Sequence, residues 1–469
     1  MFQVAFFSDK SIDKQALKCY YMLEIKFELQ FSGDRSLNME IKRDLYLNKL
    51  IVRKRNGLIK VITGVRRCGK SYLLNNIFYR HLLSEGVDPD HIIRFAFDSA
   101  DDLLLIGEDL IKLQKANKKV NPEKFMAYIR TKIVDEEVYY LLLDEVQEMD
   151  AFETVLNGYL RRENMDVYVT GSNAKFLSSD IITEFEGRGD EVHLNPLSFS
   201  EFMTVWEGDK YEGLSQYMLY GGIPLVVLRK DDRDKATTLQ RLFNEIYIKD
   251  IVRRHKVRKQ EEMEDLLNIL SSSVGSLTNP EKLKNTFRSV KKSTISSETV
   301  KRYISYFADS YLLEEAKRYD VKGRAYINTT NKYYFSDLGL RNARINFRQF
   351  EQNHAMENVI YNELRMRGYN VDVGVVPVAE KDKKGTVTRH YLEVDFICNL
   401  GSSRVYIQSA YSIPDEEKRA QETRSFRRID DSFKKIIVTR DTAKPWYDDN
   451  GILTVSIYDF LLDRTIIEK

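Results

Sequence analysis

The sequence predicts an α/β chain built on a parallel, doubly wound sheet, with helical and further α/β regions after it. Two observations carry this prediction. Apolar runs typical of strands alternate with helical segments from residue 58 to about 200, and a turn with glycines at 64 and 69 joins the first strand to a helix. Strands separated by helices form parallel sheets, because each crossover returns the chain to the same edge.

The composition sets limits on the function. The 469 residues suffice for several domains of roughly 100–200 residues each. A net charge of only +2 excludes a polycation, so any nucleic-acid surface is a local patch. The cysteines at 19, 68 and 398 follow no metal or disulfide spacing, which favours a reducing compartment, and we expect a cytoplasmic protein.

Nothing in the sequence predicts a membrane or secretory segment. The longest nearly uncharged apolar run, at 219–228, is shorter than the roughly 20 residues of a membrane-spanning helix. The start at Met1 lacks a basic region and a cleavage site. Residues 1–38 show no clear period, and we interpret them as an appendage or as sequence upstream of a true start at Met39.

Taking the elements in order, a helix follows Met39, with Asp44 as its expected cap and Leu47, Leu50 and Ile51 on one face. Strands are expected at 58–63, 91–97, 138–143 and 166–170, and a helix at 70–83 with Leu73, Leu74, Ile77, Phe78 and Leu82 on one side. The third strand is uncharged along its length, which predicts burial on both faces.

Helices dominate the region from 201 to 340, with a glycine break at 220–224 and a short β pattern at 325–336. Alternation of helix and strand resumes after 341. The elements expected there are helices at 353–368 and 414–427 and strands at 369–376, 390–398, 404–411 and 434–438.

The turn at 64–71, GVRRCGKS, has the G-x-x-x-x-G-K-S pattern of a phosphate-binding loop. Its glycines permit a tight turn whose N–H groups point at a phosphate, and the helix that begins near Lys70 adds its positive end. Lys70 is expected to reach the β- and γ-phosphates of ATP, and the Ser71 hydroxyl to ligate Mg²⁺. The nucleotide-binding residues are predicted to be Gly64, Val65, Arg66, Arg67, Cys68, Gly69, Lys70, Ser71 and Tyr72. The alternative is an ordinary strand–helix turn.

Two further strand ends support the site. The run VYYLLLDEVQ places Asp144 and Glu145 at the end of a buried strand, where Asp144 would hold Mg²⁺ and Glu145 would polarise the attacking water. The alternative is that the two acids open a helix. The next strand ends in GSNAKF, so Asn173 or Ser172 would lie near the γ-phosphate and hold the lytic water; the alternative is a plain turn.

In this order the motifs GVRRCGKS, LLLDEVQ, TGSNAKFLSSD, EGRGDEVHLNPLSFSEF and YGGIP resemble a large prokaryotic family of AAA-type (AAA- or STAND-like) P-loop ATPases. The resemblance covers about 39–469, and the family start matches Met39. It implies a P-loop ATPase domain at 39–205, a helical lid or linker at 206–260, a winged-helix-like domain at 261–340 and a restriction-endonuclease-like domain at 341–469.

The resemblance implies that Arg188 lies near the nucleotide or at a subunit boundary, where it would act as an arginine finger. The alternative is an ion pair with Glu184, Glu186 or Asp190. Arg66 and Arg67 would contact phosphate or the neighbouring acidic strand ends, or would be solvated. Arg254 matches a family position whose role does not follow from the sequence.

Residues 281–303 carry a local charge of +5, from seven basic and two acidic residues. Their last helix places Val300, Ile304 and Phe307 on one face and turns Thr299, Lys301 and Arg302 outward, as in a recognition helix. This pattern predicts contact with double-stranded DNA. The alternative is a solvated face on a helical packing domain.

The restriction-endonuclease-like fold implied by the resemblance uses an acid on a helix, an aspartate on a strand and (D/E)-x-K on the next strand. Glu357 and Asp395 fill the first two places, while Gln408-Ser409-Ala410 stands at the third and lacks the lysine. Nuclease activity is therefore doubtful, and binding of DNA or a protein partner is favoured. Glu357 and Asp395 would otherwise be a buried polar pair.

We interpret the chain as a slow Mg²⁺-dependent ATPase that acts as a nucleotide-driven switch for its C-terminal domains. The alternatives are an ATP-regulated nuclease and a non-hydrolysing adaptor or DNA-binding module. An oligomer is compatible with the sequence, and a membrane role is not expected.

Overall fold

The computed structural model describes residues 41–171, 185, 187–290, 292–349, 351–381, 387–441 and 444–468. The chain divides into two compact units, 1–42 and 43–469, and the helices and strands described here lie in the second. The predicted appendage at 1–38 and the start at Met39 lie outside the described residues. In the described part, no helix combines the length and the apolar character that a membrane span needs.

A parallel five-stranded sheet forms the first half of the second unit, with strand order β2-β3-β4-β1-β5. Its strands are β1 (Ile59–Gly64), β2 (Ile92–Ala96), β3 (Tyr139–Asp144), β4 (Met165–Thr170) and β5 (Gly189–Leu194). The first four confirm the predicted strands, and the sheet confirms the predicted α/β class with a parallel sheet. Strand β5 was not predicted, because GDEVHL mixes charged and apolar residues and gives no continuous apolar run.

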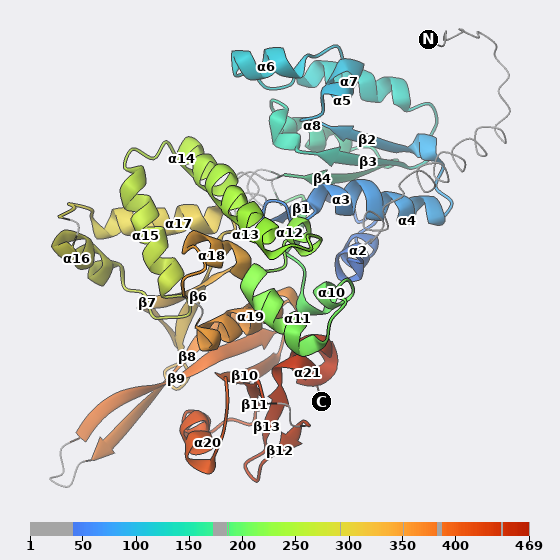
Figure 1. Cartoon of the computed structure of the whole chain (residues 1–469). Coiled ribbons are helices and arrows are strands. Elements are labelled where there is room, and N and C mark those ends of the chain that lie inside the picture. The colour runs from blue at the N-terminus through green and yellow to red at the C-terminus, as the bar shows by residue number, and fades with distance from the viewer. Residues whose placement is uncertain are drawn as a thin grey trace. The chain divides into compact units, whose positions relative to one another are not determined.

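Helices cover both faces of this sheet, as Figure 1 shows. On one face, α5 (Ala100–Leu105), α7 (Pro122–Lys132) and α8 (Phe152–Tyr159) share an apolar cluster with Leu141 and Leu143 of β3. On the other face, Tyr140 and Leu142 of the same strand join a cluster with α2 (Asp44–Ile51) and the helix after the phosphate loop. Alternate strand residues point to opposite faces, so this division fits a doubly wound sheet.

The helix predicted at 70–83 is present, as α3 (Lys70–Tyr72), a π-helical stretch η2 (Leu73–Phe78) and α4 (Tyr79–Ser84) in succession. Leu73, Leu74, Phe78 and Leu82 are buried as expected, and Ile77 is half-buried. The prediction that Asp44 caps α2 was wrong. Arg43 is the cap residue, without a side-chain capping bond, and Asp44 lies in the first turn.

The predicted helical region follows the sheet. Its members are α10 (Phe199–Met203), α11 (Lys210–Tyr220), α12 (Pro224–Val227), α13 (Asp232–Arg241), η6 (Leu242–Ile248) and α14 (Lys249–His255). The last three form one uninterrupted helical run. Tyr247 and Ile251 of this run are buried in the same apolar cluster as Leu74, so the run is fixed to the nucleotide-side half of the chain.

Three helices and a hairpin come next: α15 (Gln260–Ser272), α16 (Pro280–Val290), α17 (Ser297–Asp309), β6 (Leu313–Asp320) and β7 (Ala325–Phe335). On α17, Val300, Ile304 and Phe307 are buried, while Lys301 and Arg302 are exposed, as predicted. Thr299 is half-buried. Helices followed by a hairpin are the order of a winged helix, and that assignment stays a prediction.

The hairpin does not stand alone, because β6 pairs in parallel with β8 and joins an eight-stranded sheet of order β12-β13-β11-β10-β9-β8-β6-β7. The other strands are β8 (Asn370–Lys381), β9 (Val387–Leu400), β10 (Ser403–Ala410), β11 (Lys434–Thr439), β12 (Trp446–Tyr447) and β13 (Ile452–Ser456). The helices in this part of the chain are α18 (Leu338–Arg344), α19 (Gln352–Met366), α20 (Glu416–Thr423) and α21 (Ile457–Leu462). Figure 1 shows β8 and β9 as a long ribbon.

The strands predicted after 341 are all present, whereas β6, β12 and β13 were missed. Strand β6 carries the polar sequence LEEAKRYD, which gives a poor strand pattern. The restriction-endonuclease-like assignment and the predicted domain boundaries stay predictions.

Candidate nucleotide site

The phosphate loop begins where β1 meets its neighbour β5. A Cβ atom on Gly64 would lie 2.0 Å from the Leu194 carbonyl oxygen, so a larger residue there would push the two strands apart. At the other end of the loop, Gly69 has φ +97°, a conformation that glycine adopts without strain. The two glycines that define the motif are therefore both required by the backbone.

Lys70 opens the helix, and its side chain turns back over the loop. Its buried Nζ donates to the carbonyl oxygens of Gly64 at 3.0 Å and Val65 at 3.2 Å. An ammonium group has three hydrogens, so one remains for a phosphate oxygen. Because the loop carbonyls already fix the side chain, little conformational entropy is left to lose on binding.

The predicted magnesium ligands lie against each other. Asp144 ends β3 and is buried, and it accepts hydrogen bonds from the hydroxyls of Ser71 and of Thr170 at the end of β4. Burial raises the pKa of Asp144, and the two hydroxyl hydrogen bonds oppose that shift. A carboxylate beside a serine hydroxyl is an all-oxygen set, which suits Mg²⁺.

Glu145 follows in a left-handed conformation with φ +50°. Its N–H donates to Thr170 Oγ1 at 3.1 Å, and its carboxylate accepts a hydrogen bond from the Gln147 side chain. A third acid, Asp98, lines the same cavity just beyond β2. Burial, together with Glu145 and Asp144, raises the pKa of Asp98. Asp98 was not among the predicted site residues, although a polar residue directly after a predicted strand was the available signal.

These strand ends open into a cavity of about 1050 Å³. Six of the predicted nucleotide-binding residues line it: Arg66, Arg67, Gly69, Lys70, Ser71 and Tyr72. The side chains of Val65 and Cys68 are instead buried in the apolar core, and Cys68 Sγ donates to the Leu194 carbonyl at 3.3 Å. Burial raises the pKa of the Cys68 thiol. Gly64 does not line the cavity either, so these three residues shape the loop rather than the cavity wall.

Helix α14 closes one side of the cavity with charged residues that the sequence analysis did not place. The Asp250 carboxylate lies 3.0 Å from Arg66 of the phosphate loop, 3.2 Å from Arg253 and 2.5 Å from Arg254. All four side chains line the cavity. Arg66 was expected to contact phosphate or an acidic strand end, or to be solvated. The structure pairs it with an acid on α14 rather than at a strand end, and its contact with phosphate stays a prediction.

Arg188 does not lie beside the phosphate loop of its own chain. Its carbonyl accepts from Ile59 N–H at 2.9 Å, at the start of β1, whereas the loop follows Gly64 at the far end of that strand. Five residues of strand span about 17 Å. Asp190, one of its suggested partners, pairs with Arg53 at 2.8 Å. A role at a subunit boundary stays a prediction.

The predicted water-holding residues Ser172 and Asn173 lie outside the described residues, as do Glu184 and Glu186.

The second predicted site brings its acids together around a lysine. Lys332 of β7 is buried, and its Nζ lies 2.8 Å from Glu357 on α19, 2.7 Å from Glu393 and 4.0 Å from Asp395, both on β9. The Asp395 N–H lies 3.4 Å from Gln408 Oε1, so Gln408 is adjacent too. Lys332 and Glu393 were not among the predicted site residues. Glu393 sits two residues before Asp395, which puts both on one face of the strand, and that spacing was the signal.

The Lys332 ammonium lies among the carboxylates that a nuclease would use for a metal. Burial would lower the pKa of Lys332, but Glu357, Asp395 and Glu393 raise it above its ordinary value. Burial and Glu357 raise the pKa of Asp395, and Lys332 opposes this. Within the described residues, no group of three or more His, Cys, Asp or Glu side chains is arranged to hold a metal ion. The cluster does not fit a divalent cation in this state.

Comparison with known proteins covers most of the chain. Residues 56–203 match the family model of an AAA domain, and residues 211–351 match a domain of unknown function, DUF8612. An uncharacterized protein of Haemophilus influenzae is 33% identical over 429 residues, which is 90% of this chain and 98% of that protein. An uncharacterized protein of Methanocaldococcus jannaschii is 27% identical over 444 residues, 89% of this chain and 88% of that protein.

Among solved structures, a Walker-type ATPase of Pyrococcus abyssi is 15% identical and covers 65% of this chain and 96% of its own, with a TM-score of 0.43. A likeness at that score carries no argument about function.

Proposed function

We propose that this chain, which belongs to the same family as the uncharacterized Haemophilus influenzae protein and carries an AAA domain, is a slow Mg²⁺-dependent ATP hydrolase whose nucleotide state switches its C-terminal domains. One observation carries the proposal. A single cavity is lined by Lys70 and Ser71 of the loop, by Glu145 after β3 and by the arginines of α14. Positive charge for the phosphates, a carboxylate for the water and a helix with charged side chains thus meet in one place.

ATP is held first by the loop. The free hydrogen of Lys70 and the N–H groups at the start of α3 face the phosphates, since the helix N-terminus favours negative charge. Ser71 and Asp144, which already touch each other, are the residues that would hold Mg²⁺. When bound with ATP, the ion would offset negative charge on the phosphates.

Glu145 is the proposed group that orients the attacking water. Its carboxylate is half-buried at the cavity wall, and the hydrogen bond from Gln147 fixes its direction. Asn173 and a neighbouring subunit's equivalent of Arg188 complete the proposed machinery, the first for the water and the second for charge on the γ-phosphate.

The switch part of the proposal rests on α14. At one end of α14, Asp250 pairs with Arg66. The hydroxyl of Tyr247, in the η6 stretch just before α14, donates to the Arg66 carbonyl at 3.3 Å. At the other end the His255 ring stacks on Tyr306 of α17, with centroids 3.7 Å apart. Helix α14 thus touches both the phosphate loop and α17, so a triphosphate that attracts Arg66 and Arg254 would change the contacts of both.

Hydrogen exchange of the intact chain tests the switch. With saturating Mg·ATP, Glu145→Gln should show altered exchange in α14 and α17, because it binds ATP without turning it over. Lys70→Ala, which should not bind ATP, serves as the control and should show no change. If Glu145→Gln binds ATP and exchange in both helices stays the same, the switch proposal is wrong.

The proposed target of the switch is double-stranded DNA. Lys301 and Arg302 are exposed on the first turns of α17, and Lys282 and Arg288 are exposed on α16. Their charge suits phosphate contacts. A protein partner of the C-terminal α/β region remains a further expectation. Nuclease activity is not part of the proposal, since Lys332 occupies the carboxylates that a metal would need.

A further inference from the structure

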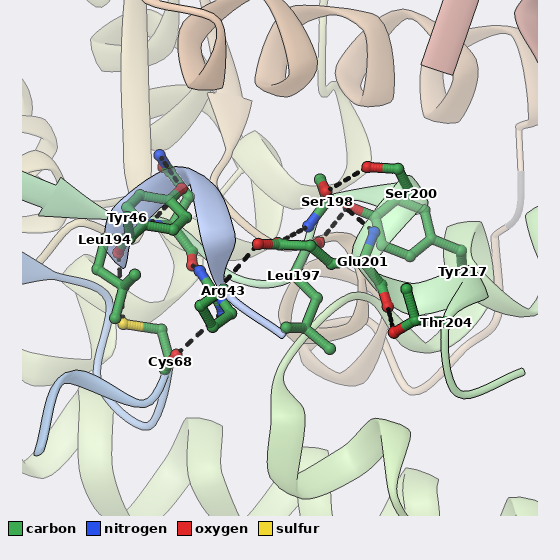
Figure 2. A network of polar contacts seen from close by, with 11 residues as sticks. Arg43, Tyr46, Cys68, Leu194, Leu197, Ser198, Ser200, Glu201, Thr204 and Tyr217 are labelled. Carbon is green, nitrogen blue, oxygen red and sulfur yellow. Dashed lines mark hydrogen bonds and ion pairs between the residues drawn. The ribbon is translucent and has the colours of Figure 1, made fainter. Parts of the chain in front are cut away.

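Arg43, immediately before α2, reaches the back of the phosphate loop. Its guanidinium donates to the Cys68 carbonyl at 3.4 Å and to the Asn195 carbonyl at 2.6 Å. Its Nε lies 3.2 Å from Glu201 Oε1. Figure 2 shows the Arg43 side chain between Cys68 on one side and Glu201 on the other.

The pair is built into the interior. Only 6% of the Arg43 side chain and 9% of the Glu201 side chain are exposed, so water solvates and screens these two charges very little. Glu201 is itself fixed by a capping box with Ser198 at the start of α10, and the Arg43 guanidinium lies over the Tyr46 ring at 4.7 Å. The guanidinium is therefore held in one orientation by its surroundings.

The contact with Cys68 bears on the nucleotide through the peptide group. In a trans peptide the carbonyl of one residue and the N–H of the next point in opposite directions. A Cys68 carbonyl directed at Arg43 therefore directs the Gly69 N–H away from Arg43. Gly69 lines the cavity, whereas the Cys68 side chain is buried in the core.

We propose that Arg43 is a positioning residue for the nucleotide site, which aims the Gly69 N–H at the phosphates by holding the Cys68 carbonyl. The inference rests on the proposed ATPase function and deepens it. It also gives a role to Glu201 in the LNPLSFSEF stretch, because Glu201 neutralises and orients the guanidinium that touches the loop.

Arg53 offers a matched control. It lies just after the same helix and also forms an ion pair, with Asp190 at 2.8 Å, and it donates to the Lys49 carbonyl at 3.0 Å; neither partner belongs to the phosphate loop. Loss of either arginine removes one ion pair near α2. Only loss of Arg43 should change the phosphate contacts.

The experiment compares wild type, Arg43→Gln, Arg43→Lys and Arg53→Gln, with Kd for Mg·ATP and Mg·ADP, KM, kcat and the melting temperature of the nucleotide-free chain. Arg43→Gln should raise Kd for both nucleotides and KM about tenfold, because a peptide held by a charged donor becomes free. The kcat should change much less, since Glu145 is untouched. Arg43→Lys should recover part of the loss, because it keeps the charge but not the planar fork.

Arg53→Gln should keep the wild-type Kd even if its melting temperature falls. The inference is overturned if folded Arg43→Gln binds both nucleotides within twofold of wild type, or if Arg53→Gln weakens binding equally. Should both Arg43 variants fail to fold, Glu201→Gln replaces them, with the same direction expected in Kd and unchanged binding overturning the idea. If the wild type binds no ATP, the proposed function itself is wrong. Lys70→Ala is the control that shows whether the assay detects loss of ATP binding at the phosphate loop.

Discussion

Arg66 of the phosphate loop and Asp250 of α14 form an ion pair with 3.0 Å between their nitrogen and oxygen atoms. The pair joins the residue that follows Val65 in the loop to a helix that begins at Lys249. Both side chains line the cavity in which we place ATP. The same carboxylate holds Arg254, so a triphosphate entering the cavity competes with Asp250 for two guanidinium groups.

This geometry predicts unequal roles for two adjacent arginines. Arg254 is largely enclosed, with 16% of its side chain exposed, whereas 83% of the Arg253 side chain is exposed. Arg254→Gln should raise Kd for ATP about tenfold, the loss typical of a charge-assisted hydrogen bond. Arg253→Gln, the matched control, should change Kd less than about threefold, because water screens an exposed charge. Equal effects in a titration with a fluorescent ATP analogue would contradict the assignment.

The proposed DNA surface predicts a particular salt dependence. Lys301→Ala with Arg302→Ala should weaken binding to a random duplex, and the slope of log K against log salt should become shallower by about 1.8, the value for two lost phosphate contacts. Lys230→Ala with Arg233→Ala removes the same charge from the exposed start of α13 and should leave the slope unchanged. Fluorescence anisotropy at several salt concentrations measures both. Binding of wild type that does not respond to salt would exclude the surface.

His193 of β5 should make the fold sensitive to acid. Burial lowers its pKa from 6.5 to about 4, and Nδ1 lies 3.1 Å from Thr63 Oγ1. In the unfolded chain the imidazole binds a proton at the ordinary pKa, so the unfolded state takes up more protons between these values. Stability from this residue is therefore complete above about pH 6.5 and is lost as the pH falls toward 4.

The test is the midpoint of urea unfolding measured across this pH range for wild type and His193→Gln. The variant should lose less stability than wild type as the pH falls, because it has no imidazole to protonate. Parallel curves would show that another group causes the pH dependence.

The buried cluster around Lys332 should matter for stability rather than for cleavage. Lys332→Met leaves Glu357, Glu393 and Asp395 without their shared cation and should cost about 3–5 kcal/mol of unfolding free energy. Lys322→Met, in the exposed turn between β6 and β7, makes the same change at the surface and should cost less than about 0.5 kcal/mol. Metal-dependent nicking of DNA by wild type, abolished in Asp395→Ala, would contradict the structural role.

Much of the nucleotide half was predictable because its strands are continuous apolar runs that end in polar motifs. Asp144 and Glu145 could be placed at a strand end without any tertiary information. Strand β5 could not be predicted in this way, since its charged residues interrupt the apolar ones and leave no apolar run. The direction of the Cys68 side chain was also beyond prediction, because it depends on how β5 approaches the loop.

The remaining site residues come from distant parts of the chain. Arg43, Asp250 and Lys332 carry no local motif, and each acquires its role from a contact with a residue far away in the sequence. The lysine missing from the third strand of the predicted nuclease-like site has a counterpart on β7, which the spacing along β10 could not indicate.

The central claim is that ATP is hydrolysed in this cavity by a water molecule that Glu145 orients. The most direct test is ATP turnover at saturating nucleotide. Glu145→Gln should bind Mg·ATP with the wild-type Kd and lose hydrolysis on the order of 100-fold, the typical cost of removing a positioned base. Glu148→Gln removes a neighbouring carboxylate that lines the same cavity and should retain most of the activity. Equal turnover in wild type, Glu145→Gln and Lys70→Ala would contradict the claim.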